Sequence, residues 1–317
     1  MRGIGVLAIV LLVTFLVTAV ASSGSGAGDE FETGDSWSYD ADLTIESMLL
    51  SGTYAVTYEG ESTKSVAGYT YSTYEMKYHG TLTVTGSMGG YAVTGTATLN
   101  EIDSVDQESL NLVVSDYTMS MTLSAVILGT AYSYGYSEHN VSTYSPPGGV
   151  GDEPEDPDEG TSWTNTYTVH YETTVNDDGD ITTESSSISV TETYTYLGVK
   201  TITVPAGTFK CEVIQTDYGA GISTDWYCDD VGAYVKSVYE SGSTQSGTEQ
   251  LTSFSYTPPA SAGALSNAMM LTIAAVVVIV VVVIIAAWVL MKRKAPPKAQ
   301  QTSPVTVESG PPRPPAG

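Results

Sequence analysis

The residues with the most definite chemistry are the only two cysteines of the chain, Cys211 and Cys228. Strand-forming residues flank a Gly-Ala pair at 219–220, and glycine at the first position of a two-residue turn favours a type II′ hairpin. We expect its strands over Thr208–Tyr218 and Ile222–Asp229. In that register the cysteines lie opposite each other at a non-hydrogen-bonded position, where side chains are closest. In an oxidising compartment this predicts a disulfide; two buried free thiols are the alternative.

A serine nucleophile is the second possibility that the residue types raise. Residues 34–36 read Gly-Asp-Ser, as in the nucleophile block of secreted lipases and esterases. Such a serine needs a histidine as its base, but His79, His139 and His170 do not stand in an Asp-x-x-His setting near the C-terminus. No Gly-x-Ser-x-Gly elbow, phosphate loop or pair of metal-binding histidines is present. We therefore predict no enzyme activity, and no catalytic, cofactor-binding or metal-binding residues.

Two acidic runs could bind calcium. Residues 176–180 (Asn-Asp-Asp-Gly-Asp) join two expected strands, and Asp-Gly there favours a hairpin turn over a calcium site. Residues 152–159 are acidic but interrupted by prolines, and they lack the acid-x-acid-x-acid-Gly spacing of a calcium loop. We expect a turn at the first run and a connecting segment at the second.

The charge of the chain is strongly acidic, with a formal net charge of −25 at pH 7. All acidic residues except Glu308 lie between residues 22 and 267, where the only basic residues are five lysines. A surface of this kind repels nucleic acid. Either adaptation to salty surroundings or a surface that depends on divalent cations would account for it. The acids are spread out rather than clustered at ligand spacings, which favours salt adaptation.

The region between the two apolar ends of the chain predicts an antiparallel all-β fold. Thr, Tyr, Val and Ser dominate it, and alternating stretches such as 117–121, 166–171 and 201–204 are separated by glycine-rich breaks. A Pro/Gly-rich acidic linker at 145–160 divides it into β unit 1 (34–144) and β unit 2 (161–257). Gly34–Trp37 and Gly160–Trp163 open the two units in a similar way. Two related units and one continuous sheet with an inserted loop both fit this pattern.

The apolar ends predict export and a single membrane anchor. Residues 1–21 resemble a signal peptide, and a flexible segment follows at 22–33. Residues 268–291 carry no charge and are long enough for a transmembrane helix; a juxtamembrane linker (258–267) precedes them. The basic cluster 292–294 at the start of a Pro-rich tail (292–317) places that tail in the cytoplasm. In an exported chain, the sequon at Asn140 is a glycosylation candidate, expected in a loop.

Part of unit 2 resembles a known family. The run from Val204 to Cys211 contains Pro205, Gly207 and Phe209, and Trp226-Tyr227 and the strand around Gly232 follow it. Residues 205–207 predict an edge corner or a bulge, because proline removes a ladder hydrogen bond and glycine permits a bend. This order is similar to the C-terminal strands of the lipoprotein-localisation-factor half-barrels. The resemblance covers about Gly198–Tyr239 and implies a curved antiparallel sheet, in some members with acyl chains on its concave face. The long helices that plug such a sheet are missing from this sequence.

These observations together predict a cell-membrane protein with its N-terminal ectodomain outside and no enzymatic role. Its expected function is the binding of a lipid-like molecule or another envelope ligand, including an envelope protein. A structural surface or assembly protein with no small ligand is the alternative, and a secreted-type esterase is a third. The ligand, the partner and the oligomeric state do not follow from the sequence.

Overall fold

The computed structural model describes residues 31–45, 47–88, 90–127, 129–149, 154, 157–242 and 245–256. The expected signal peptide, the transmembrane segment at 268–291 and the tail lie outside these residues. Among the residues that are described, no helix combines the length and the apolar character needed to cross a membrane.

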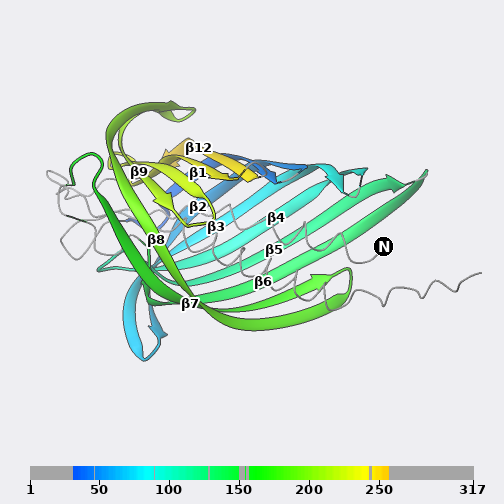
Figure 1. The fold of residues 1–317 in the computed structure, drawn as a ribbon, viewed down its shortest axis with the longest axis horizontal. Coiled ribbons are helices and arrows are strands. Elements are labelled where there is room, and N and C mark those ends of the chain that lie inside the picture. The colour runs from blue at the N-terminus through cyan, green and yellow to red at the C-terminus, as the bar shows by residue number, and fades with distance from the viewer. Residues whose placement is uncertain are drawn as a thin grey trace, which may run out of the picture.

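Twelve antiparallel strands form one closed barrel in which each strand pairs with its neighbours in sequence, and β12 pairs with β1 (Figure 1). The strands are β1 (Ser36–Ile45), β2 (Met48–Val66), β3 (Tyr69–Met88), β4 (Tyr91–Asp106), β5 (Leu112–Ile127), β6 (Thr130–Gly148), β7 (Ser162–Asp177), β8 (Asp180–Val204), β9 (Gly207–Asp217), β10 (Ile222–Cys228), β11 (Ala233–Ser241) and β12 (Gln245–Ser255). The all-β antiparallel expectation is therefore confirmed. The sheet closes on itself, so the expected half-barrel is wrong in that respect.

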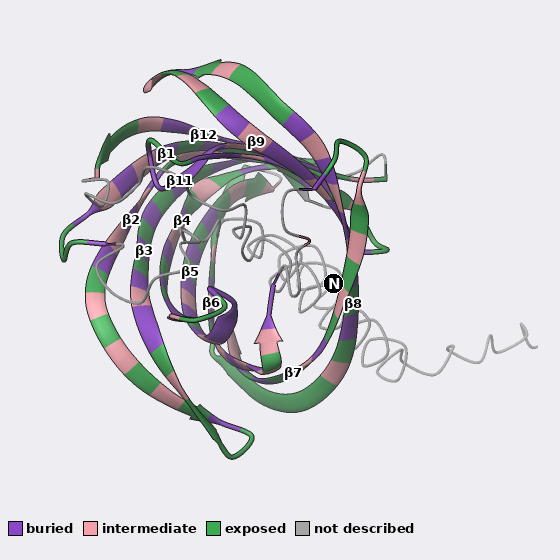
Figure 2. Ribbon diagram, turned by 90° about the vertical axis from the view of Figure 1, so that its left-hand side faces the viewer, coloured by how far each residue is buried: buried purple, intermediate pink, exposed green. Residues whose placement is uncertain are grey.

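Alternation along each strand separates an inward face from an outward face. In β1, Trp37, Tyr39, Leu43 and Ile45 are buried, while Asp40 and Asp42 between them are exposed. The same period of two recurs along the other strands, and Figure 2 shows buried and exposed residues alternating along the strands of the barrel. Because successive side chains in a strand point to opposite sides, the buried set forms the inner wall.

Contacts between strands that are not neighbours identify the buried face as the interior. Trp37 of β1 donates its indole N–H to the carbonyl of Val231 at 2.8 Å, in the turn between β10 and β11. The Tyr39 hydroxyl donates to the carbonyl of Tyr234 in β11 at 3.0 Å, although β12 lies between these strands. Side chains reach past an intervening strand most easily on the concave side of a curved sheet.

The barrel consists of two six-stranded halves that repeat the same irregularities. Gly34 and Gly160 have φ angles of +98° and +92° before β1 and β7. Their amides donate to the carbonyls of Tyr58 and Tyr196, at 2.9 and 2.8 Å. A register shift follows Tyr58 in β2 and Tyr196 in β8. The similar openings seen in the sequence thus occupy equivalent places in one closed sheet.

The repeat continues into the next strands. Register shifts at Ser104/Val105 in β4 and at Trp226/Tyr227 in β10 are equivalent. The turns that follow them repeat as well: the Leu110 amide donates to the Asp106 carbonyl at 2.8 Å, and the Gly232 amide donates to the Cys228 carbonyl at 3.0 Å. Both donor residues have positive φ angles, +57° for Leu110 and +65° for Gly232.

Two local expectations differ from the structure. Residues 145–148, expected in the linker, form the end of β6, where Ser145 pairs with Thr168 and Gly148 with Leu112. The corner at Pro205 is a two-residue turn between β8 and β9 rather than an edge or a bulge, because Val204 pairs directly with Gly207. The bulge of this region lies earlier, between Tyr196 and Val199.

Candidate binding site inside the barrel

Six carboxylates lie on the inward face of the strands, and we call them the carboxylate belt. Each is at most 8 % exposed. They are Glu101 and Asp103 in β4, Glu138 in β6, Glu192 in β8, Asp225 in β10 and Glu249 in β12. Carboxylates are rarely buried unless they are paired or hydrogen-bonded, so the belt is the chemically most unusual part of the interior.

Hydroxyl groups supply most of the hydrogen bonds that the belt receives. Ser115 donates to Glu101 at 2.6 Å, Tyr136 to Glu138 at 2.7 Å, and Tyr54 to Glu249 at 3.0 Å. The two tyrosines that donate to Glu192 are Tyr167, at 2.6 Å, and Tyr194. Neutral donors of this kind stabilise a carboxyl group without neutralising its charge.

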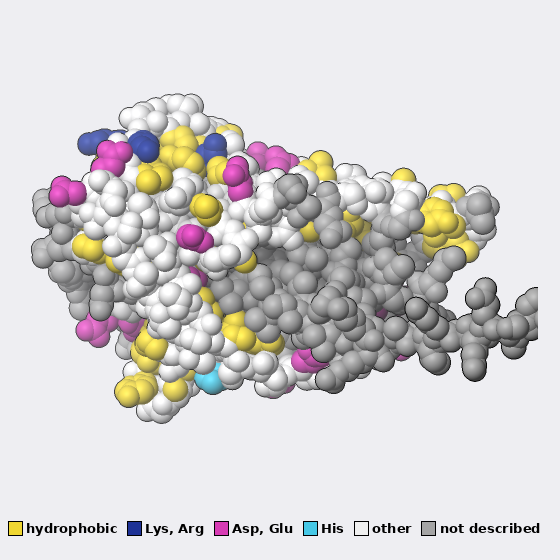
Figure 3. Space-filling view, viewed as in Figure 1, with side chains coloured by type: hydrophobic (Ala, Val, Ile, Leu, Met, Phe, Trp, Pro, Cys, Tyr) yellow, Lys and Arg dark blue, Asp and Glu magenta, His cyan; other side chains and the backbone are white. Residues whose placement is uncertain are grey.

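The lysines of the described residues lie outside the barrel interior. They are exposed or half-buried, and two of them form ion pairs, Lys64 with Glu75 and Lys77 with Glu59. Three lysines lie on β8, β9 and β11, within four successive strands, and Figure 3 shows basic side chains gathered on one side of the molecule. Lysines are therefore absent from the inward face that carries the belt among the described residues.

Burial raises the pKa values of five belt carboxyls, since it penalises the charged form. Desolvation raises the pKa of Glu192 to about 7, opposed by hydrogen bonds from Tyr167 and Tyr194. Desolvation likewise raises the pKa of Asp103 and of Asp225 to about 7 each. The pKa of Glu101 is raised well above its ordinary value, first by burial and then by the neighbouring charge of Asp103. These carboxyls therefore hold protons at a pH where exposed carboxyls have lost them.

The wall beside the belt is apolar and aromatic. Inward positions of β1 to β5 carry aliphatic and thioether side chains at one end of the barrel, among them Leu43, Leu50, Val84, Met121 and Leu123. At the other end Phe31 lies against the rings of Trp37, Tyr58, Tyr74 and Tyr256, with centroid distances of 5.4 to 6.2 Å. The inner surface is thus apolar at both ends and acidic between them.

One end of the barrel carries exposed apolar side chains on five successive hairpins. We call this set the apolar rim; it consists of Leu49, Tyr91, Val126, Tyr132, Ile181 and Ile222, which are 39 to 68 % exposed. Figure 3 shows apolar side chains at the right-hand tip, where the β5–β6 hairpin ends in Figure 1. Exposed apolar groups collected at one place indicate a contact or entry surface. A shallow groove of about 450 Å³ crosses β4, β5 and β6 at this end, lined mainly by outward residues such as Thr94, Ser124 and Val126.

The predicted disulfide joins Cys211 to Cys228 and is confirmed. The Tyr218 amide donates to the Gly221 carbonyl at 3.0 Å around the 219–220 turn, and Gly219 has a φ of +76°, as a type II′ turn requires. The Cα atoms of the two cysteines are 4.4 Å apart, the separation of a non-hydrogen-bonded pair. The bond fastens β9 to β10 and is a structural element.

The other residues of the family-like motif also build the wall. Phe209 lies edge-on to Phe254, and Lys236 lies over the ring of Trp226 at 5.6 Å. Tyr227 lies edge-on to Tyr234. Gly232 leaves room for the ring of Tyr256, which a Cβ atom would approach to 2.5 Å. The ring of Phe209 also lies close to Gly207, where an added Cβ atom would be 3.1 Å from it.

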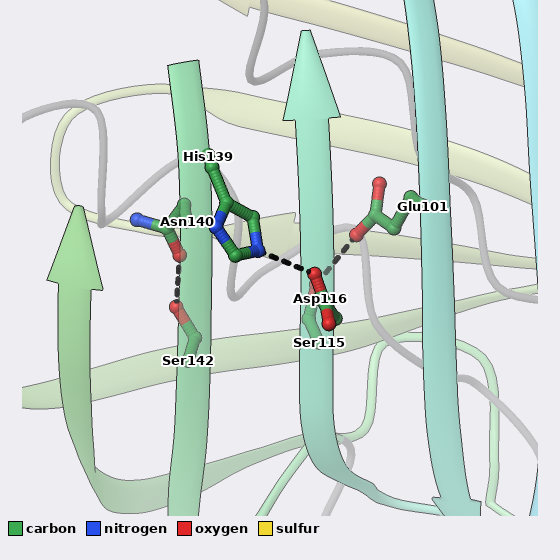
Figure 4. Close-up of polar contacts among 6 residues, drawn as sticks. All are labelled: Glu101, Ser115, Asp116, His139, Asn140 and Ser142. Carbon is green, nitrogen blue, oxygen red and sulfur yellow. Dashed lines mark hydrogen bonds and ion pairs between the residues drawn. The ribbon is translucent and has the colours of Figure 1, made fainter. Parts of the chain in front are cut away.

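Asn140 lies in the middle of β6, so its expected place in a loop is wrong. It is 5 % exposed, its amide donates to Thr173 at 2.6 Å, and it accepts a hydrogen bond from Ser142 at 2.7 Å (Figure 4). The amide nitrogen is therefore engaged inside the folded barrel. Glycosylation there stays a prediction that requires modification before the barrel closes.

The residues considered for esterase chemistry lie apart. Ser36 begins β1, where it pairs with Thr57 and Ser255. The three histidines are exposed and contact other residues: His79 contacts Asn100, His139 contacts Asp116 (Figure 4) and His170 contacts Ser187. Among the described residues, the hydrogen bonds of these histidines do not include Ser36.

The acidic run at 176–180 is the β7–β8 hairpin turn, as expected. Asp177 pairs with Asp180, and Asp178 and Gly179 have φ angles of +51° and +99°. The Asn176 side chain accepts a hydrogen bond from the Gly179 amide at 2.9 Å. No group of three or more His, Cys, Asp or Glu side chains suited to a metal ion occurs in the described part of the chain.

The carboxylate belt was not predicted from the sequence. A signal was present, because Glu138 stands two residues from Tyr136, Glu192 from Tyr194, and Asp225 from Ser223. An acid two positions from its donor shares its face of the strand. In a sequence with 36 acidic residues, this spacing does not distinguish the buried face from the exposed one.

Comparison of the chain with protein-family models, with curated proteins and with solved structures found no match. The class that the geometry defines is thus a closed twelve-stranded antiparallel barrel with an acidic belt in an otherwise apolar interior.

Proposed function

We propose that this protein is a membrane-anchored, extracytoplasmic binding protein that holds a lipid-like ligand inside its barrel. The observation that carries the proposal is the inner wall, which combines apolar ends with a belt of carboxyl and hydroxyl groups. Such a wall suits a molecule with an apolar body and one polar group, because a few placed polar groups in an apolar site fix the orientation of a ligand.

The number of strands supports a ligand-binding interior. Eight strands enclose a space that side chains just fill, or that holds one small ligand, and barrel diameter grows about linearly with the number of strands. Twelve strands enclose more space than the eight of a side-chain-filled barrel. A molecule larger than a single small ligand is therefore compatible with the fold.

The apolar rim gives such a ligand a route of entry. Its six side chains lie at hairpins of one end of the barrel, and the last strand, β12, ends at Ser255 at the opposite end. If the predicted segment at 268–291 anchors the chain, the rim faces away from that membrane. A lipid-like molecule would then pass between the barrel and a donor or acceptor beyond the cell membrane.

Native mass spectrometry of the ectodomain, Ser22–Ser261, purified from its own host without detergent, tests this function. We expect an adduct of lipid mass that organic extraction removes. The variant Met121→Glu, which places a charge on the apolar wall, should lose the adduct, while Thr122→Glu on the outward face should keep it. A protein that carries no adduct and binds no added lipid would favour the structural surface protein instead.

A further inference from the structure

We propose that the Glu101–Asp103 sector of the carboxylate belt binds the primary ammonium head group of an amphiphilic ligand. This inference rests on the proposed function and adds the chemistry of the head group. Two observations support it. The inward side chains of β3 to β6 line up around these two carboxyls, and several buried polar atoms among them have no hydrogen-bond partner in the described residues.

Strand register brings the polar groups of this sector into two adjacent rows. In one row Glu101 lies between Tyr78 and Tyr117, and Asn140 follows. The other row begins at Asp103 and continues through Ser115 to Ser142. Figure 4 shows Ser115 of β5 beside Glu101 of the neighbouring strand β4, and Ser142 beside Asn140 within β6. The two rows are two residues apart along each strand and therefore share the inward face.

Three polar atoms of the sector are fully buried without a hydrogen-bond partner among the described residues. They are Oε2 of Glu101, Oδ1 of Asp103 and the hydroxyl of Tyr117. Tyr117 is 8 % exposed and lies directly opposite Glu101 in the register, and the charges of Glu138 and Glu101 both act on its hydroxyl. Buried polar groups in native proteins nearly always have a hydrogen-bond partner. These three atoms would therefore suit a ligand group that donates several hydrogen bonds.

The second half of the barrel offers an internal comparison. Asp225 in β10 is equivalent to Asp103 in β4. Asp225 pairs with Ile214 and Asp103 pairs with Met76. Ile214 and Met76 in turn pair with the two tyrosines that precede the repeated register shifts in β8 and β2. Where β4 has Glu101, β10 has Ser223, and this serine approaches both carboxylate oxygens of Asp225, at 3.0 and 2.9 Å. The barrel can thus satisfy a single buried aspartate at this position with a serine. The first half instead places a second carboxylate there.

Glu101 and Asp103 share a side-chain hydrogen bond and therefore hold a proton between them, since like charges at close range cannot both remain ionised in an apolar interior. The described part of the chain supplies no lysine or arginine here, and no cluster there suits a metal ion. An ammonium group that displaces the shared proton donates three hydrogen bonds and compensates the charge of the ionised pair.

Isothermal titration of the full chain, held in an amphipathic polymer without detergent, with decylamine and decanol tests the head group. We expect decylamine to bind at least about tenfold more tightly than decanol, the scale of a charge-assisted hydrogen bond. Glu101→Gln and, separately, Asp103→Asn should remove this preference and leave decanol binding unchanged. If one variant does not fold, the other makes the same comparison.

A control separates a local effect from a general one. Asp116→Asn removes an exposed carboxylate from the outward face of β5. This variant should keep the preference for decylamine. Equal binding of the two probes to the unaltered chain would overturn the head-group inference and leave the proposed function standing. Binding of neither probe would overturn both.

Discussion

At the scale of the residue, the barrel is distinguished by carboxyl groups that are buried among hydroxyl donors. Glu192 is fully buried and accepts hydrogen bonds from Tyr167 and Tyr194. Glu138 and Glu249 depend on Tyr136 and Tyr54 in the same way. A buried acceptor that loses its donor destabilises the folded state by the free energy of its desolvation. Each of these tyrosine hydroxyls therefore stabilises the fold by donating a hydrogen bond to its carboxyl group.

Tyr167→Phe removes one of the two donors to Glu192 and keeps the ring. We expect a loss of about 1–3 kcal/mol in the free energy of unfolding, as for other buried groups that lose a partner. Urea denaturation followed by circular dichroism measures it. Tyr69→Phe is the matched control, since Tyr69 is 68 % exposed and should change stability little. Equal effects of the two substitutions would contradict the role given to the hydroxyl.

The raised pKa of Glu192 makes stability depend on pH with a definite sign. The folded protein holds this proton up to about pH 7, whereas the unfolded chain releases it near pH 4. The folded state therefore binds more protons between these values, and stability falls as pH rises from about 4 through 7. Glu192→Gln should flatten this fall in unfolding free energy between pH 5 and 8. The control is Glu172→Gln, which alters an exposed residue of β7 and should keep the original dependence of unfolding free energy on pH. An unchanged pH dependence in Glu192→Gln would contradict the role given to the Glu192 carboxyl.

At the scale of the element, the two halves of the barrel share their bulges and turns. Gly60 and Gly198 each lie two residues after an equivalent tyrosine, with φ angles of +133° and +80°. An L-amino acid is strained in this region, because its Cβ approaches the backbone. The repeated glycines thus let β2 and β8 bend at the same place.

Gly198→Ala should cost about 1–2 kcal/mol of unfolding free energy for this backbone strain. Gly135→Ala in β6 is the control, since Gly135 does not have a positive φ and a Cβ there would meet no atom within 4 Å. We expect it to be neutral or slightly stabilising, as alanine is less flexible than glycine in the unfolded chain. Thermal unfolding of both variants measures the two changes in unfolding free energy. Equal losses of stability would show that the bend at Gly198 does not need glycine.

The disulfide acts at the same scale, because it fixes the β9–β10 hairpin. Its partners are 17 residues apart, and the chain-entropy model gives about 3 kcal/mol for a loop of this length. The double variant Cys211→Ala, Cys228→Ala should lose about that much in urea denaturation. Reduction of the unaltered protein should reproduce the loss. Two alkylatable thiols in the native protein would show that the bond does not form.

Sequence reasoning reached some elements of this fold and missed others for physical reasons. The β9–β10 hairpin and its disulfide followed from local information, since a two-residue turn fixes the register of every pair behind it. Closure of the barrel depends on β1 pairing with β12, a contact between the two ends of the sheet that no local pattern encodes. The place of Asn140 was missed because a sequon does not reveal which face of which strand carries it.

The belt was missed for a related reason. Glu101 and Asp103 have the same spacing as the exposed pair Asp40 and Asp42, and only the closed sheet turns the first pair inward and the second outward. The residues of the motif around Pro205 form wall and turns rather than a site. The chemistry of the interior thus becomes visible only once the strands are assembled.

For the whole molecule, the proposed function requires a ligand that lies inside the barrel rather than on its surface. The most direct test is photolabelling of the ectodomain with decanol that carries a diazirine in its chain, followed by peptide mapping. We expect labels on inward residues such as Leu99, Met121 and Leu123, and competition by unlabelled decanol. Labels confined to outward residues such as Thr94 and Ser124, in the groove across β4 to β6, would contradict the central claim.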